Sequence, residues 1–201
     1  RSTLFPYTTL FRSVKFTNIH KLRGANRALA GTGIELMLPS IDLPDVPEIQ
    51  SDDQTEVSVD KAIKYHALLR CPIVVMDSGL FIEPLGGFPG VYTKYVLGVL
   101  GIDKLVNLVQ NIEKPVAFTQ RTITYFDGVT LKTFSSKVTG TLVREPRGMN
   151  GRNYDKYFVA DGRDKTIAEF SDEEQTALTA PVWQEFAAWV NKHKKDLCSS
   201  K

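Results

Sequence analysis

The stretch that decides the fold runs from Cys71 to Tyr95 and reads CPIVVMDSGLFIEPLGGFPGVYTKY. Its apolar start, residues 73–76, is rich in β-branched side chains, as is typical of a strand buried on both faces. We expect this strand to end at Asp77, with a tight turn at Ser78-Gly79 and a second short strand over 80–82. Three glycines in residues 86–90 predict a loop, because glycine reaches backbone conformations that other residues rarely adopt. A helix is predicted from Val91.

A carboxylate at the end of a strand, followed by a glycine loop and by Lys94, could hold a metal ion and phosphate groups. The structural alternative is a buried strand, a turn and a loop in which Asp77 has no special role. The residue types alone leave the two interpretations level.

On either side of this stretch, the apolar spacing predicts further elements. The strand signals are residues 34–38, 115–126, 129–142, 157–159 and 166–170, with Asp127-Gly128 as a hairpin turn. We expect the two long strands to form an antiparallel pair flanking a mostly parallel set. Helices are predicted after Asn18, after residues 51–54, over 103–111 and over 172–178, and Thr179 is expected to cap a separate last helix. In that last helix Trp183, Phe186, Ala187 and Val190 form a stripe for core or dimer packing.

The composition is that of one globular domain, with 42% hydrophobic and 10% aromatic residues in 201. Thr3 to Ser13 matches an in-frame translation of a common sequencing-adaptor oligonucleotide, so residues 1–13 are expected to be an artefact and residues 14–198 the domain. Without Arg1 and Arg12 the formal charge falls from +2 to zero. We therefore expect no nucleic-acid partner and no membrane partner. Two distant cysteines, Cys71 and Cys198, favour a reducing cytoplasm over a disulfide or zinc site.

Residues 77–95 resemble the central signature of the inosine triphosphate pyrophosphatase family, whose members hydrolyse non-canonical purine nucleoside triphosphates. The likeness extends from Asn18 to the C-terminal helix. It implies an α/β fold with an elongated mixed central sheet, flanking helices, and two lobes with a cleft between them. It also implies hydrolysis of a nucleoside triphosphate to a monophosphate and pyrophosphate, with Mg²⁺ or another divalent cation as cofactor. A homodimer is expected as well.

The resemblance assigns Asp77 as the catalytic residue that binds the metal and activates water. Glu48 is the second implied metal ligand, and Asp45 is the alternative because residues 43–45 carry nearly the same pattern. The residues at matching positions that are implied to bind substrate are Thr17, Asn18, Lys21, Lys61, Ser78, Lys94, Tyr154, Asp155 and Gln175.

This chain departs from the family pattern at several polar positions. Met76 replaces an acidic residue, Gln175 lies near a base-binding lysine, and residues 179–181 replace a Ser-His-Arg triplet. The lost acid at Met76 implies weaker binding of Mg²⁺. Since the lost lysine and Ser-His-Arg groups would have donated to the base, we expect weak discrimination between bases. A catalytically weak nucleotide-binding or regulatory protein on the same fold is the alternative function.

Overall fold

The computed structural model describes residues 19–39, 44–151 and 153–198, with side chains from Lys21 to His193 within these ranges. The segment 1–13 lies outside the described residues. None of the described helices is both long enough and apolar enough to cross a membrane.

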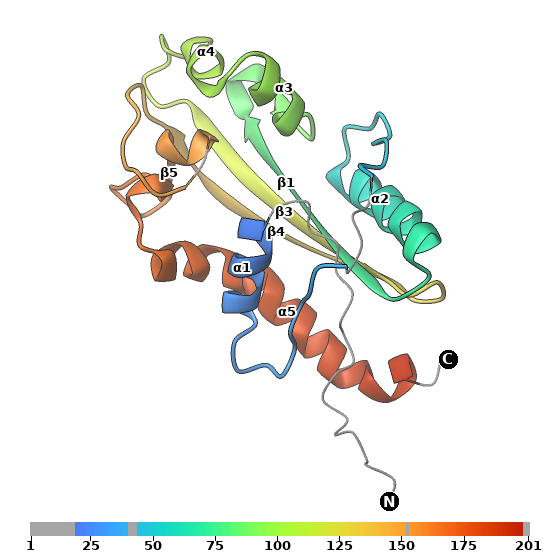
Figure 1. The fold of residues 1–201 in the computed structure, drawn as a ribbon. Helices are drawn as coiled ribbons and strands as arrows, with labels where there is room; N and C mark the ends of the chain where they lie inside the picture. Colours follow the sequence, from blue (N-terminus) through green and yellow to red (C-terminus); the bar gives the residue numbers. More distant parts are fainter. Residues whose placement is uncertain (1–18, 40–43, 152, 199–201) are drawn as a thin grey trace, which may run out of the picture.

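A five-stranded sheet with the order β2-β1-β3-β4-β5 forms the centre of the molecule (Figure 1). Every neighbouring pair in it is antiparallel. The long strands β3 and β4 are joined by the predicted hairpin, where the Asp127 carboxylate accepts from the backbone N–H groups of Val129 and Thr130. The strands are β1 Ile73–Ile82, β2 Pro89–Gly90, β3 Val116–Phe126, β4 Leu131–Leu142 and β5 Phe158–Ala160.

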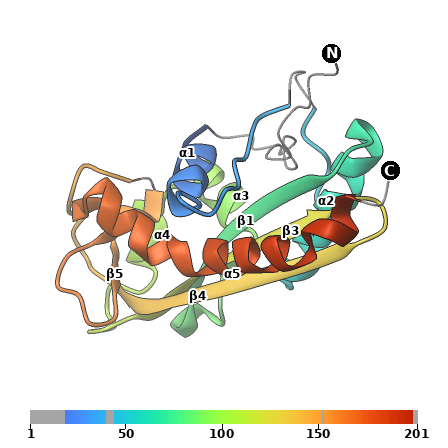
Figure 2. The same ribbon diagram turned by 90° about the horizontal axis from the view of Figure 1, so that it is seen from below.

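Helices cover both faces of the sheet: α1 and α5 pack on one face, and α2 packs on the other (Figures 1 and 2). The N-cap Asp53 fixes the start of α2 because its carboxylate accepts from Thr55 N at 2.7 Å. The helices are α1 Ile19–Ala28, α2 Gln54–Leu69, α3 Thr93–Val99, α4 Ile102–Asn107 and α5 Asp172–Cys198, with 3₁₀ turns η1 Glu83–Leu85, η2 Asn153–Lys156 and η3 Ile167–Glu169.

Alternate residues of β1 enter different apolar clusters, as the period of a strand requires. Val74 packs with the α1 and α5 side chains, whereas Ile73 and Val75 pack with Ala62 and Tyr65 of α2. A third cluster lies at the other end of β1, where Leu80 and Ile82 pack with side chains from α4 and β5. The apolar run 73–76 is therefore buried on both faces, as expected.

The α/β fold with an elongated sheet and flanking helices is confirmed, but three local expectations are wrong. β1 does not end at Asp77: it pairs with β3 without interruption from Ile73 to Ile82. The expected mostly parallel set is absent among the described strands. A strand that is apolar on both faces is typical of a parallel sheet, but here helices cover both faces of an antiparallel sheet and bury the strand in the same way. Residues 34–38 form no strand.

Two expectations near the C-terminus are also wrong. Residues 166–170 form the 3₁₀ turn η3 with a single bridge to Val159 instead of a strand, because the Thr166 and Glu169 side chains form a capping box. Thr179 caps no helix, since α5 continues through Pro181. The stripe of Trp183, Phe186, Ala187 and Val190 belongs to the core cluster beneath α1, so core packing is the correct alternative.

Candidate active site

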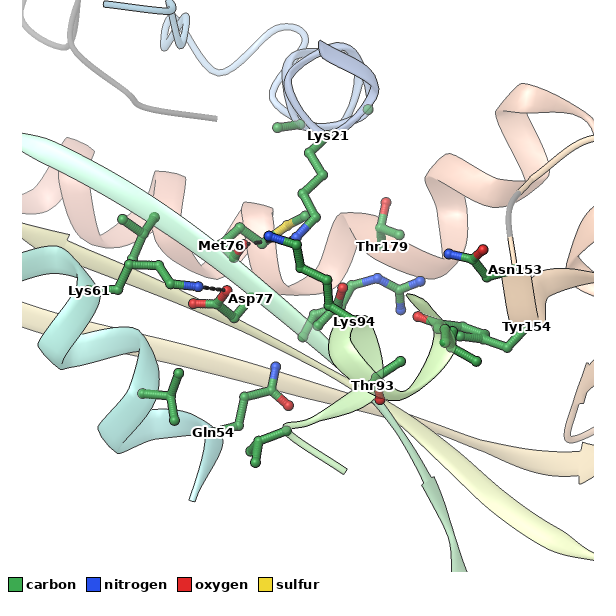
Figure 3. Close-up of a pocket in the computed structure, with 18 of the residues that line it drawn as sticks. Lys21, Gln54, Lys61, Met76, Asp77, Thr93, Lys94, Asn153, Tyr154 and Thr179 are labelled. Atoms are coloured by element: carbon green, nitrogen blue, oxygen red, sulfur yellow. Dashed lines mark hydrogen bonds and ion pairs between the residues drawn. The ribbon is translucent and has the colours of Figure 1, made fainter. Parts of the chain in front are cut away.

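A cleft of about 1110 Å³ lies where elements distant in the sequence meet. Its lining comes from α1, α2, β1, α3, β3, η2 and the first turns of α5. Figure 3 shows Lys61, Asp77 and Lys21 gathered at one end and Asn153 and Tyr154 at the other. The cleft therefore offers a charged end and an aromatic end.

Lys61 is the centre of the charged end. From α2 it donates to Asp77 Oδ1 at 2.6 Å and to Glu48 Oε1 at 2.8 Å, and its side chain is only 15% exposed. Burial acts to lower the pKa of Lys61, but the contacts with Asp77 and Glu48 outweigh burial and raise the pKa. The second carboxylate oxygen of Asp77, Oδ2, is buried and has no hydrogen-bond partner among the described residues.

Two more lysines complete the charged end. Lys21 from α1 donates to the backbone carbonyl of Met76 at 3.2 Å, and Lys94 extends from α3 toward the same space (Figure 3). Burial lowers the pKa of Lys21, and the nearby ammonium groups of Lys61 and Lys94 lower it further, while Asp77 opposes them. Three ammonium groups around a carboxylate are an arrangement suited to a polyanion such as a triphosphate.

The aromatic end is built on η2 and α5. Burial is the main cause that raises the pKa of the Tyr154 hydroxyl, and Asp155 raises it further. The hydrogen bond with Ser78 and the positive charge of Arg121 oppose this shift. Gln175 donates its side-chain amide to the carbonyl of Ile167 at 3.1 Å. A base that enters this end meets an aromatic ring and a carboxylate.

The predicted site residues within the described chain all line this cleft: Lys21, Glu48, Lys61, Asp77, Ser78, Lys94, Tyr154, Asp155 and Gln175. Thr17 and Asn18 lie outside the described residues. Asp45 also lines the cleft, but it is Glu48 that forms the ion pair with Lys61. The glycine loop 86–90 does not line the cleft; it packs against Phe81 and leads the chain to α3. The individual roles of these residues stay predictions.

Sequence reasoning missed several lining residues, and Arg121 of β3 is the most notable of them. Apart from Gln120, the other residues of β3 are threonines and apolar or aromatic residues, so a lone arginine in a central strand was the available signal. Thr179 and Trp183 of α5 also line the cleft, although Trp183 was assigned only to the core stripe.

The donor set suits a divalent cation only in part. Within the described residues no group of three His, Cys, Asp or Glu side chains is placed to hold a metal. Two carboxylates, Asp77 and Glu48, meet at Lys61. Mg²⁺ is often held by one or two carboxylates together with substrate phosphates, so this pair fits a cation that the substrate also binds.

Comparison with known proteins identifies one family and several similar pyrophosphatases. A family model described as the Ham1 family matches residues 15–180. A dITP/XTP pyrophosphatase of Methanopyrus kandleri is 37% identical over 179 residues, which cover 88% of this chain and 94% of that protein. Inosine triphosphate pyrophosphatase 2 of Trypanosoma cruzi is 34% identical over 138 residues, which cover 67% of this chain and 70% of that protein.

Solved structures share the fold. A crystal structure of a nucleoside-triphosphatase / dITP/XTP pyrophosphatase from Mycobacterium abscessus has a TM-score of 0.70 at 25% identity, covering 89% of this chain and 96% of that chain. A HAM1 protein from Coxiella burnetii has a TM-score of 0.81 at 22% identity, covering 92% of this chain and all of that one (100%).

Proposed function

This chain belongs to the Ham1 family, and from that premise we propose that it hydrolyses non-canonical purine nucleoside triphosphates to a nucleoside monophosphate and pyrophosphate. Relatives at 31–37% identity that carry the name dITP/XTP pyrophosphatase support this reaction. The observation that carries the proposal is the charged end of the cleft, where Lys61 joins Asp77 to Glu48 and Lys21 and Lys94 lie beside them.

The proposed reaction is attack of a water oxygen on the α-phosphorus. The bond between the α-phosphorus and the bridging oxygen breaks, and pyrophosphate leaves with that oxygen. Asp77 accepts the proton of the attacking water and so makes it a better nucleophile. Lys21, Lys61 and Lys94 bind the phosphate oxygens and stabilise the negative charge that moves onto the leaving group. The base stacks on Tyr154 at the other end.

The proposal includes a divalent cation such as Mg²⁺, held by Asp77 and Glu48. The buried Oδ2 of Asp77, which has no hydrogen-bond partner among the described residues, supports this assignment. When bound, the cation would polarise the phosphoryl oxygens and neutralise part of their charge. The Lys61 ammonium already contacts both carboxylates, so it competes with the cation when no substrate is present.

A homodimer in the cytoplasm is a further part of the proposal. The free thiol of Cys71 is consistent with a reducing compartment. Exposed apolar side chains on α3, among them Tyr95 and Val99 at 73% exposure each, offer a surface on which a second copy could pack. Light scattering on the purified protein measures the oligomeric state directly.

The test of the reaction is pyrophosphate release from inosine, xanthosine, adenosine and guanosine triphosphates, each with and without Mg²⁺. We expect release from the inosine and xanthosine substrates and a loss of release when Mg²⁺ is removed. Nucleotide binding without any release of pyrophosphate would overturn the proposed reaction and favour a binding or regulatory protein.

A further inference from the structure

Arg121 is a half-buried cation that lines the cleft and that the proposed reaction does not use. On β3 it lies opposite Ser78 of β1 and opposite Ser136 of β4. Directly opposite residues of antiparallel strands project to the same face, so Arg121 shares a face with Ser78, which binds the Tyr154 hydroxyl. Its side chain lines the cleft, and its Nη1 is buried without a hydrogen-bond partner among the described residues.

A buried guanidinium N–H without a partner costs free energy unless a ligand supplies an acceptor. The unpaired Nη1 therefore favours a role in binding over a role in folding. The ligand has to present an acceptor at this depth of the cleft.

Register places Arg121 at the base end, because Ser78 opposite it is hydrogen-bonded to Tyr154. Burial and Asp155 raise the pKa of Tyr154, and Arg121 is the cation that opposes them. The phosphate end also already holds three lysines, so a fourth cation is not required there.

We propose that Arg121 is a specificity-determining residue whose guanidinium donates hydrogen bonds to O6 and N7 of a purine, so that the enzyme selects 6-oxopurine nucleotides. The proposal rests on the function proposed above. Arginine matches this edge because its planar fork presents two N–H donors to two acceptors in one plane. Hypoxanthine, xanthine and guanine share both acceptors, whereas adenine carries an amino donor at position 6 that meets the guanidinium donors unfavourably.

This role also replaces the expectation of weak base discrimination. That expectation counted donors only at Gln175, Ala180 and Pro181. One amide hydrogen of Gln175 is committed to the Ile167 carbonyl, so Gln175 alone is a poor substitute for an ammonium group. Arg121 supplies the missing donors from the sheet instead of from α5.

The test compares the parent protein with Arg121→Met, Arg121→Lys and, as a matched control, Arg163→Met. Arg163 lies on an exposed turn and does not line the cleft. We expect Arg121→Met to lower kcat/KM for inosine and guanosine triphosphates about tenfold or more, with adenosine triphosphate within about threefold of the parent. Arg121→Lys keeps the charge but loses the planar fork, so it should recover only part of the loss. Arg163→Met should match the parent on all three substrates.

Inhibition by pyrophosphate distinguishes the two ends of the cleft, and we expect it to be the same in Arg121→Met and the parent. Equal losses on all three triphosphates, or weaker inhibition by pyrophosphate, would assign Arg121 to the phosphates and overturn the proposal. An unchanged ratio of inosine to adenosine triphosphate activity would also overturn it.

Calorimetric binding of inosine and adenosine monophosphates separates this proposal from the proposed reaction, because it needs no turnover. If the parent hydrolyses no triphosphate, the proposed reaction fails, while a preference for inosine monophosphate that Arg121→Met abolishes still supports the role of Arg121. No such preference in the parent would refute that role. Should Arg121→Met fold poorly by circular dichroism, the same comparison between the parent and Arg121→Lys decides.

Discussion

Lys61 and Lys21 carry the same ammonium group into the charged end of the cleft but meet opposite surroundings. For Lys61, ion pairs with Asp77 and Glu48 outweigh burial and raise the pKa above its ordinary value of 10.5. For Lys21, burial dominates, Lys61 and Lys94 add to it, and the pKa lies below 10.5. The structure thus stabilises one charge and disfavours the other, which leaves Lys21 in need of an anionic ligand.

The signs of these shifts predict different effects on stability. Lys61 stabilises the fold at every pH below 10.5, and this contribution disappears as the pH rises through its raised pKa. The charged form of Lys21 costs stability below its lowered pKa, and this cost is relieved as the pH rises from there toward 10.5. At pH 7, Lys61→Met should therefore lower the free energy of unfolding by about 1–3 kcal/mol, whereas Lys21→Met should leave it within about 1 kcal/mol.

Urea unfolding of both variants measures this difference, and both should lose at least about tenfold in kcat/KM because each removes a phosphate ligand. A loss of stability in Lys21→Met as large as that in Lys61→Met would contradict the assignment of opposite surroundings.

Asp77→Asn removes a negative charge without a change in volume. We expect kcat to fall about a hundredfold or more, because the amide neither accepts the proton of water nor holds a cation as a carboxylate does. Lys61 keeps its contact with Glu48, so the fold should persist. Asp45→Asn is the matched control, since Asp45 lines the same cleft without an ion pair to Lys61. Activity of Asp77→Asn within a few-fold of the parent would show that another group activates the water.

At the scale of elements, the helices and strands that were predicted correctly are those in which the local sequence signals and the tertiary packing favour the same structure. β3, β4 and their Asp127-Gly128 turn are of this kind, because β-branched residues and turn chemistry favour the same hairpin. α2 is another, since Asp53 provides its cap. Local signals failed where tertiary packing overrides them. Thr179 was expected to cap a separate helix, but the continuous apolar face of α5 against α1 and β4 keeps one helix.

The same reasoning explains why the site was only partly predictable. Asp77 and Lys94 lie in a motif whose residue types carry their chemistry, whereas Lys61 was assigned only through the family resemblance. Arg121 lies in no motif, and its position in the cleft follows from its register with Ser78. Register between distant strands is set by the whole sheet, so a single strand does not reveal it.

Gly79 was predicted to lie in a turn, but it lies within strand β1. The glycine is needed for close approach, because a Cβ there would lie 2.5 Å from the carbonyl oxygen of Gly90 in β2. Gly79→Ala should separate β1 from β2 and lower the free energy of unfolding by about 1–3 kcal/mol. The control is Gly98→Ala in α3, where a Cβ meets nothing within 4 Å, and where better helix propensity should leave stability equal or higher. Equal urea midpoints for Gly79→Ala and the parent would contradict this packing.

At the scale of the whole molecule, the cleft connects segments from nearly the full length of the chain. α1 and α5 line it from one face of the sheet, α2 belongs to the other face, and η2 and α3 complete the lining. A ligand that reaches both ends of the cleft therefore contacts elements from both faces of the sheet. Such a ligand should stabilise the molecule as a unit.

A nucleotide and pyrophosphate should differ in how far this stabilisation extends. Inosine α,β-imidotriphosphate, which resists cleavage at the scissile bond, should raise the free energy of unfolding by about 2.7 kcal/mol when its concentration is a hundredfold above its Kd. Pyrophosphate at the same excess should raise it equally by mass action, so hydrogen exchange is the distinguishing measurement. We expect pyrophosphate to protect α1, α2 and α3, which carry Lys21, Lys61 and Lys94. The nucleotide should extend protection to η2 and the first turns of α5, because its base contacts Tyr154 there. Identical protection patterns for the two ligands would mean that the base does not bind at the aromatic end of the cleft.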